Sequence, residues 1–258
     1  MTLPDSALFA DAIADRRFWF AVAIAVLSGL VRGFSGFGSA LIYIPLVAAV
    51  YAPRTAAVTL LLIDTLGTTP ITARSLAHCT WREVLPIFVA AAIALPFGAM
   101  ALKFVDPTVL RWFMAFLVLS LLGVVISGWR YGGKPSLPIT IGVGLFSGFG
   151  SGAVQIAGPP VILYWLGTAN KAATVRANML VYFLLLDLAS CAIYFEGGII
   201  SPELLALSLL LAVPFFAATA AGATLFRGVS ELLYRRIAYG IIAAAALISL
   251  PVLDPWFR

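Results

Sequence analysis

Residues 34–39 read FSGFGS, and the same six residues return at 146–151. Each copy interrupts a stretch made almost entirely of Leu, Ala, Val, Ile and Phe. Glycine is a poor helix former, and a helix that breaks inside a membrane leaves N–H and C=O groups that hydrocarbon cannot bond. The repeated hexapeptide therefore predicts two helix breaks that lie against protein or a water-filled cavity.

The composition places the chain in a membrane. Its 258 residues are 62% hydrophobic and 10% charged, which is more apolar surface than a soluble domain of this size buries. The residues do not alternate between apolar and polar, as they would in a membrane β-barrel. We expect an all-α membrane protein. Five stretches are long enough to cross a bilayer core of about 30 Å: 84–102, 108–128, 173–195, 203–226 and 232–250.

The charges and cysteines exclude several classes of partner. The net charge of +5 fits cytoplasmic loops that lie against anionic lipid, and no basic run could follow a nucleic-acid backbone. Cys79 and Cys191 lie far apart, without the spacing of a disulfide framework or a metal site. We therefore expect free thiols, no cofactor, no metal and no nucleic acid. A homo-oligomer is compatible with the sequence.

The similarity between the two halves of the chain extends beyond the hexapeptide. Residues 54–58 resemble 171–175, and the Pro-Phe pair at 96–97 matches the pair at 214–215. These matches indicate a duplication. The expected segments are an N-terminal segment (1–17), a first repeat (18–130), a linker (131–137), a second repeat (138–250) and a tail (251–258).

Each repeat is expected to hold one broken apolar segment, 18–51 or 138–167, followed by three spans. The spans of the first repeat are 55–74, 84–105 and 108–129. If the broken segment enters the membrane and returns, the second repeat is inverted relative to the first. This arrangement places nine Lys and Arg residues inside and six outside, whereas the best parallel arrangement places seven inside and eight outside. The positive-inside rule favours inverted repeats.

An inverted pair of broken helices can form a site at the midplane of the membrane, where half-helix N-termini face an anion. We expect a half-helix to begin at each of Ser39 and Ser151, so that these hydroxyls and the N–H groups after them bind the anion. Gln155 follows the second copy by one turn and is a further donor. Small residues also let membrane helices pack closely without binding anything, but two identical copies favour a site. The complete expected substrate-binding set is Arg32, Ser35, Gly38, Ser39, Ser147, Gly150, Ser151 and Gln155.

These residues carry a resemblance to a known family. The duplicated glycine-rich break, Gly158-Pro159-Pro160 after the second copy, and the Arg/Lys-Ala-Ala openings of the following spans resemble the TauE/SafE family of sulfite and organosulfonate exporters. The resemblance covers nearly the whole chain. It implies a multi-pass protein of the bacterial inner membrane that moves a sulfur-containing anion, and it does not identify the anion.

Polar residues inside the spans are expensive and are usually functional. Asp64 lies within 55–74 and Asp187 within the equivalent span, 173–195. Either carboxylate could carry a coupled proton, or it could pair with Arg32, which needs a counter-charge. Arg176 and Asn178 are further candidates of the second half, but they lie near the start of a span, where contact with lipid headgroups is the favoured interpretation.

The sequence thus predicts a secondary transporter that exports sulfite or an organosulfonate, with possible proton coupling. The alternatives are an intramembrane enzyme and a non-transporting assembly partner. The chain has one histidine and no nucleophile–base pattern, which argues against an enzyme. A passive partner would have no need of two polar breaks.

Overall fold

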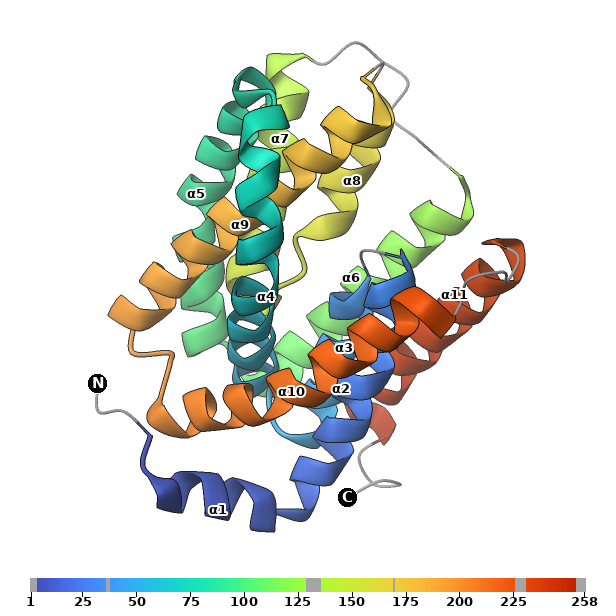
Figure 1. Cartoon of the computed structure of the whole chain (residues 1–258). Coiled ribbons are helices and arrows are strands. Elements are labelled where there is room, and N and C mark those ends of the chain that lie inside the picture. Colours follow the sequence, from blue (N-terminus) through green and yellow to red (C-terminus); the bar gives the residue numbers. More distant parts are fainter. Residues whose placement is uncertain (1–3, 36–37, 129–135, 169, 226–230, 254–258) are drawn as a thin grey trace.

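The computed structural model describes residues 4–35, 38–128, 136–168, 170–225 and 231–253, in which every regular element is a helix (Figure 1). The all-α prediction is confirmed. The α-helices are α1 (Ser6–Ala14), α2 (Arg16–Ser35), α3 (Ser39–Val50), α4 (Pro53–Ser75), α5 (Trp81–Phe104), α6 (Pro107–Ile126), α7 (Leu137–Val154), α8 (Gly158–Leu166), α9 (Ala172–Glu196), α10 (Pro202–Leu225) and α11 (Glu231–Ile248), with short 3₁₀ turns at Leu76–His78 and Pro251–Leu253.

Within the described residues, five helices are long and apolar enough to cross a membrane. They are α5, α6, α7, α9 and α10. Four of them confirm the spans predicted at 84–102, 108–128, 173–195 and 203–226. The predicted span at 232–250 falls on α11, whose described apolar part, Arg236–Ile248, is shorter. The stretch predicted at 55–74 forms α4, a continuous helix that carries Asp64.

The first hexapeptide does break a helix. α2 ends at Ser35, α3 begins at Ser39, and Gly38 between them has a φ of 91°. That left-handed conformation is open to glycine and costly for residues with a Cβ. No heavy atom lies within 4 Å of a Cβ built on Gly38, so the backbone angle alone explains the need for glycine here.

The second hexapeptide does not break a helix, so that part of the prediction is wrong. α7 runs through 146–151, and the interruption comes later, at Gln155–Ala157, before α8 begins at Gly158. The reason is packing. A Cβ on Gly148 would lie 2.0 Å from the carbonyl oxygen of Ala91 in α5, and a Cβ on Gly152 would lie 2.2 Å from that of Leu95. These glycines let two helix backbones touch, which is the usual role of small residues in membranes.

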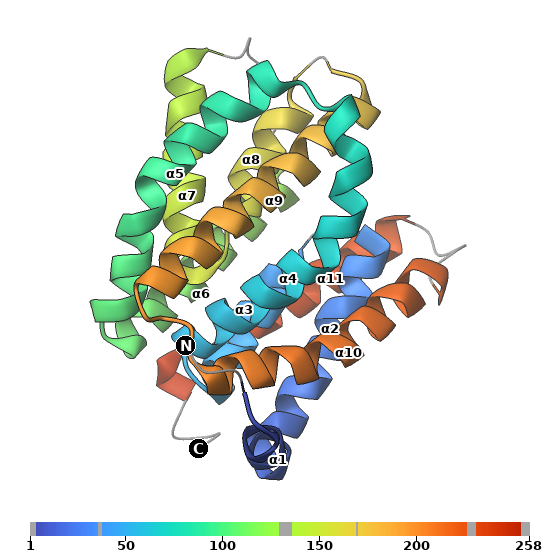
Figure 2. The same ribbon diagram turned by 60° about the vertical axis from the view of Figure 1, so that its left-hand side comes forward.

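The same type of contact joins α2 to α10. A Cβ on Gly29 would lie 2.5 Å from the carbonyl oxygen of Phe215, and one on Gly33 would lie 2.0 Å from that of Thr219. In both pairs the contacts advance along the two helices together, so α2 runs parallel to α10 and α5 runs parallel to α7. Each pair joins a helix of the first half to a helix of the second, and both pairs are visible in two views (Figures 1 and 2).

α4 and α9 run in opposite directions and are tied at both ends. Arg54, at the start of α4, donates to the carbonyl oxygens of Gly198 and Ile199, just beyond the end of α9, at 2.8 Å each. At the other end, the Thr80 N–H donates to the Asn178 side chain at 2.7 Å. Asn178 is fully buried and also donates to Glu83 at 3.0 Å. The expectation that Asn178 meets lipid headgroups is wrong, whereas Arg176 is exposed.

Arg111, near the start of α6, is buried. Its Nε and Nη2 atoms donate to the carbonyl oxygen of Ser249 at 3.1 and 2.8 Å. This carbonyl follows the end of α11, where a cation also meets the negative end of the helix dipole. Arg111 therefore fastens α6 to α11.

Both helix interruptions contact a single apolar core. This core contains Leu41 and Ile42 from the first turn of α3, Ala153 from the end of α7, and Ile156 from the second interruption. α2, α4, α6, α10 and α11 also contribute to it. The two interruptions, which lie far apart in sequence, therefore border the same core.

The glycine contacts predict a large difference between two alanine substitutions in α7. Gly148→Ala should destabilise the protein by about 2 kcal/mol, because the new methyl group forces α5 and α7 apart. Gly142→Ala is the matched control, since nothing lies within 4 Å of its Cβ position, and it should be neutral or slightly stabilising. Thermal unfolding in detergent measures both. Equal melting temperatures would contradict close packing at Gly148.

Candidate functional site

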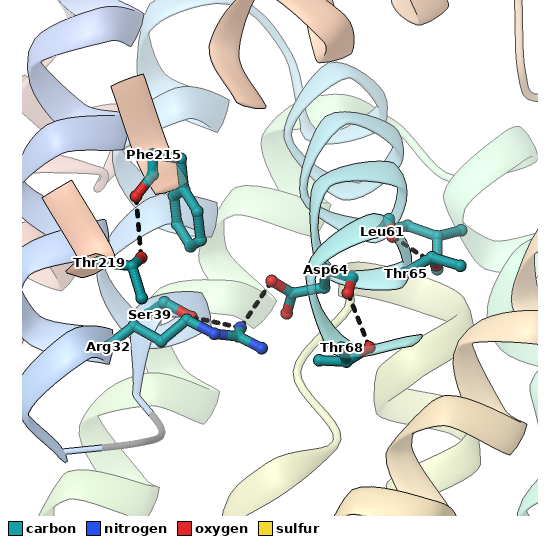
Figure 3. A network of polar contacts seen from close by, with 8 residues as sticks. All are labelled: Arg32, Ser39, Leu61, Asp64, Thr65, Thr68, Phe215 and Thr219. Atoms are coloured by element: carbon teal, nitrogen blue, oxygen red, sulfur yellow. Dashed lines mark hydrogen bonds and ion pairs between the residues drawn. The ribbon is translucent and has the colours of Figure 1, made fainter. Parts of the chain in front are cut away.

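The first interruption lies next to a guanidinium, that of Arg32. Arg32, in the last turn of α2, donates from Nη1 to the Asp64 carboxylate of α4 at 2.6 Å and to the Ser39 hydroxyl of α3 at 3.2 Å (Figure 3). The guanidinium carbon also lies 5.9 Å from the centre of the Phe215 ring. The Arg32 and Asp64 side chains are each 21% exposed. The pair is therefore largely, but not completely, buried.

The N-terminus of α3 adds to the positive charge at this point. Ser39 is its first residue and is 2% exposed. The first N–H groups of a helix have no partner within the helix, and they carry the positive end of its dipole. Gly38 precedes them with no side chain to cap them. A guanidinium, a hydroxyl and the positive end of a helix thus converge, as an anion requires.

Asp187 brings a second carboxylate to this cluster. It lies on α9, is 9% exposed, and interacts electrostatically with both Arg32 and Asp64. The sequence predicts the two aspartates in equivalent spans, and the fold brings them to one guanidinium. Two roles were predicted for these carboxylates, proton coupling or pairing with Arg32. Asp64 forms the ion pair with Arg32.

The second interruption presents an amide. Gln155 follows α7 with a φ of 54°, the one positive φ among the described residues other than glycine. Its side chain is 8% exposed, and its Nε2 donates to no acceptor in the described part of the chain. The Ser151 hydroxyl donates to Gln155 Oε1 at 3.4 Å and lies 3.3 Å from the Ser190 hydroxyl of α9. A strained backbone and a buried unpaired donor together mark a candidate binding position.

Two other residues of the second hexapeptide serve the structure. The Ser147 hydroxyl donates to the Ala157 carbonyl at 2.9 Å and accepts from Tyr182 at 2.7 Å, so its proton is already used. Gly150 is helical, and a Cβ there would lie 2.5 Å from the Ile156 carbonyl oxygen. Because α8 begins Gly158-Pro159-Pro160, two of its first N–H groups do not exist. The N–H groups after Ser151 lie within α7, so the expected half-helix N-terminus is not there.

A thiol contact connects the two interruptions. The Thr65 hydroxyl on α4 lies 3.7 Å from the Cys191 sulfur on α9. Thr65 follows Asp64, and Cys191 follows Ser190, which contacts Ser151. The polar residues of the first and second interruptions therefore flank the same crossing of α4 and α9. Both cysteines are free thiols, as expected.

Sequence reasoning missed Ser190, Tyr182 and Tyr194. The Tyr194 hydroxyl donates to the Gly152 carbonyl at 2.6 Å, in the last turn of α7. Ser190 lies three residues after Asp187, on the same face of one helix, and this spacing could have identified it. Ser35 is the last residue of α2, and its side chain lies outside the described part of the chain.

Comparison with known proteins identifies the family of the chain. The family model of the sulfite exporter TauE/SafE matches residues 21–248. No curated protein and no solved structure matches the chain. The matched region contains both interruptions, Arg32 and both aspartates. The chain is a multi-pass membrane protein that belongs to the sulfite exporter TauE/SafE family.

Proposed function

We propose that this chain exports a small sulfur-containing anion, such as sulfite or an organosulfonate, across a bacterial inner membrane. The observation that carries the proposal is Arg32, a guanidinium that lies beside the N-terminus of α3 and pairs with Asp64 of α4. Charged residues at such depth are costly and usually mark a path for a solute. Export fits the electrical driving force, because a negative-inside potential favours outward movement of an anion by about 2.3 kcal/mol per charge per 100 mV.

In this proposal the two interruptions bind different parts of the anion. Arg32, the Ser39 hydroxyl and the first N–H groups of α3 supply charge and donors from one side. The buried Gln155 Nε2 supplies a neutral donor from the other side, and Ser151, whose hydroxyl donates to Gln155 Oε1 in this structure, would turn its hydroxyl to the anion. Ser35 remains a proposed ligand at the end of α2. Gly38, Ser147 and Gly150 hold the backbone in position.

Inverted repeats are also part of the proposal. The antiparallel course of α4 and α9 supports them, since these helices are equivalents in the two halves. Helix packing between the two halves supports them too. α2 of the first half packs on α10 of the second, and its equivalent α7 of the second half packs on α5 of the first. Alternating access in inverted-repeat transporters moves one such unit against the other around a fixed site.

We assign a coupled proton to Asp187. The reason is that Asp64 is already bonded to Arg32, whereas Asp187 forms no ion pair with the residues that the structure describes. Two carboxylates near one guanidinium give a surplus of negative charge when both are ionised, and an incoming anion increases it. A proton on Asp187 would relieve this repulsion.

Arg32→Gln tests the anion site. Removing the cation should reduce sulfite transport about 30-fold or more, equivalent to ~2 kcal/mol for hydrogen bonds to a charged group. Radiolabelled sulfite entering inside-out vesicles gives the rate. Arg176→Gln, a change of an exposed arginine, is the control and should transport like the parent. Equal rates for Arg32→Gln and the parent would move the site elsewhere.

Single cysteines test the topology. Cysteine replaces Ser136, before α7, or Ser201, before α10, in a variant without Cys79 and Cys191. An impermeant thiol reagent added to intact cells should label the cysteine at 201 and spare the one at 136, because inverted repeats place these connections on opposite sides. Labelling of both to the same extent is incompatible with this arrangement.

Asp187→Asn tests coupling. The variant should lose the dependence of sulfite transport on an imposed pH gradient, because an amide cannot take up the proton. Asp11→Asn, at an exposed position of α1, should keep the parent's response. The proposed proton role fails if Asp187→Asn still follows the gradient as the parent does.

A further inference from the structure

Asp64 is paired with Arg32, the cation that the proposed substrate needs. Arg32 donates to the Asp64 carboxylate at 2.6 Å, and of the two ion pairs among the described residues this is the one that joins two long helices, α2 and α4. A carboxylate and a sulfur oxyanion offer a guanidinium the same thing, a pair of negatively charged oxygen acceptors. The two compete for Arg32 if the substrate binds the Nη1 group that donates to Asp64.

The total charge makes simultaneous occupancy unfavourable. Arg32 and Asp64 together are neutral, and Asp187 also acts on both of them. An anion added beside an ionised Asp64 would leave one guanidinium facing two or three negative groups in a medium that screens charge poorly. Release of Asp64 from Arg32 removes the strongest of these conflicts.

The helix that carries Asp64 is built to bend at this position. The hydroxyls of Thr65, Thr68 and Thr69 each donate to the carbonyl four residues earlier, at 2.7, 2.7 and 2.6 Å. Such contacts compete with the helix ladder and favour bending. Pro70 removes a further backbone hydrogen bond. Figure 2 shows α4 curved along its length.

We propose that Asp64 is a tethered substitute for the substrate. It neutralises Arg32 while the site is empty, and it leaves Arg32 when the sulfur oxyanion binds. The proposal rests on the proposed function, in which Arg32 is the anion's cation. When Asp64 leaves Arg32, the bend of α4 changes. Because α4 contacts both α9 and α10, anion binding then affects the helices of the second half.

Sulfite binding to purified protein tests the exchange. Asp64→Asn keeps the size of the side chain and removes its charge, so the variant should bind sulfite about tenfold more tightly, within the range common for coupled sites. Asp15→Asn, which removes the carboxylate of the exposed Arg17 pair, should bind like the parent. Calorimetry gives the sulfite affinity of the parent, of these two variants and of Arg32→Gln. If Arg32→Gln abolishes binding and Asp64→Asn binds sulfite no more tightly than the parent, the exchange is overturned and the proposed site remains.

Two further measurements separate the remaining outcomes. If Arg32→Gln binds sulfite like the parent, the proposed function fails at this site, whatever Asp64 does. If Asp64→Asn is unstable without ligand, its melting temperature should rise more with sulfite than the parent's does, because the anion then supplies the missing counter-charge. An equal or smaller rise would show that Asp64 only holds the fold, against the proposal.

Discussion

The ion pair between Arg32 and Asp64 is the constraint around which the membrane-spanning region is arranged. A largely buried guanidinium needs a counter-charge and hydrogen-bond acceptors, and α4 and α3 bring both within 3.2 Å. Ser39 is in place because α2 ends three residues after Arg32 and the chain turns at Gly38 into α3. The break, Asp64 and the neighbouring apolar core together hold the charge of Arg32 in place.

The two hexapeptides show how one sequence serves two purposes. In the first copy, Gly38 takes a left-handed angle and the helix stops. In the second, Gly148 lies against the backbone of α5, and the helix continues to Val154. The second interruption instead depends on Gln155, whose backbone is strained and whose buried Nε2 has no acceptor among the described residues. We infer that glycine repeats of this type indicate close helix packing as often as they indicate a binding site.

Much of this could be predicted from the sequence, because its strongest signals are local. Hydropathy gave four of the spans, and the depth of Asp64 and Asp187 within apolar stretches identified both carboxylates. The position of the second interruption could not be predicted, since it depends on whether α5 offers a backbone for the glycines to touch. The hydrogen-bond partners of the polar side chains could not be predicted either. Arg32 bonds Asp64 and not Asp187, and Asn178 bonds Glu83 and Thr80. Such outcomes belong to tertiary packing, which no local pattern encodes.

The central claim is that an anion binds at Arg32, between the end of α2 and the start of α3. Selenite resembles sulfite in shape and charge and scatters X-rays anomalously, so a crystal grown with selenite would locate the anion directly. The account predicts an anomalous peak within hydrogen-bond distance of the Arg32 guanidinium and the Ser39 hydroxyl, with Asp64 displaced from Arg32. A peak elsewhere in the membrane-spanning region, with the Arg32–Asp64 pair intact, would contradict it.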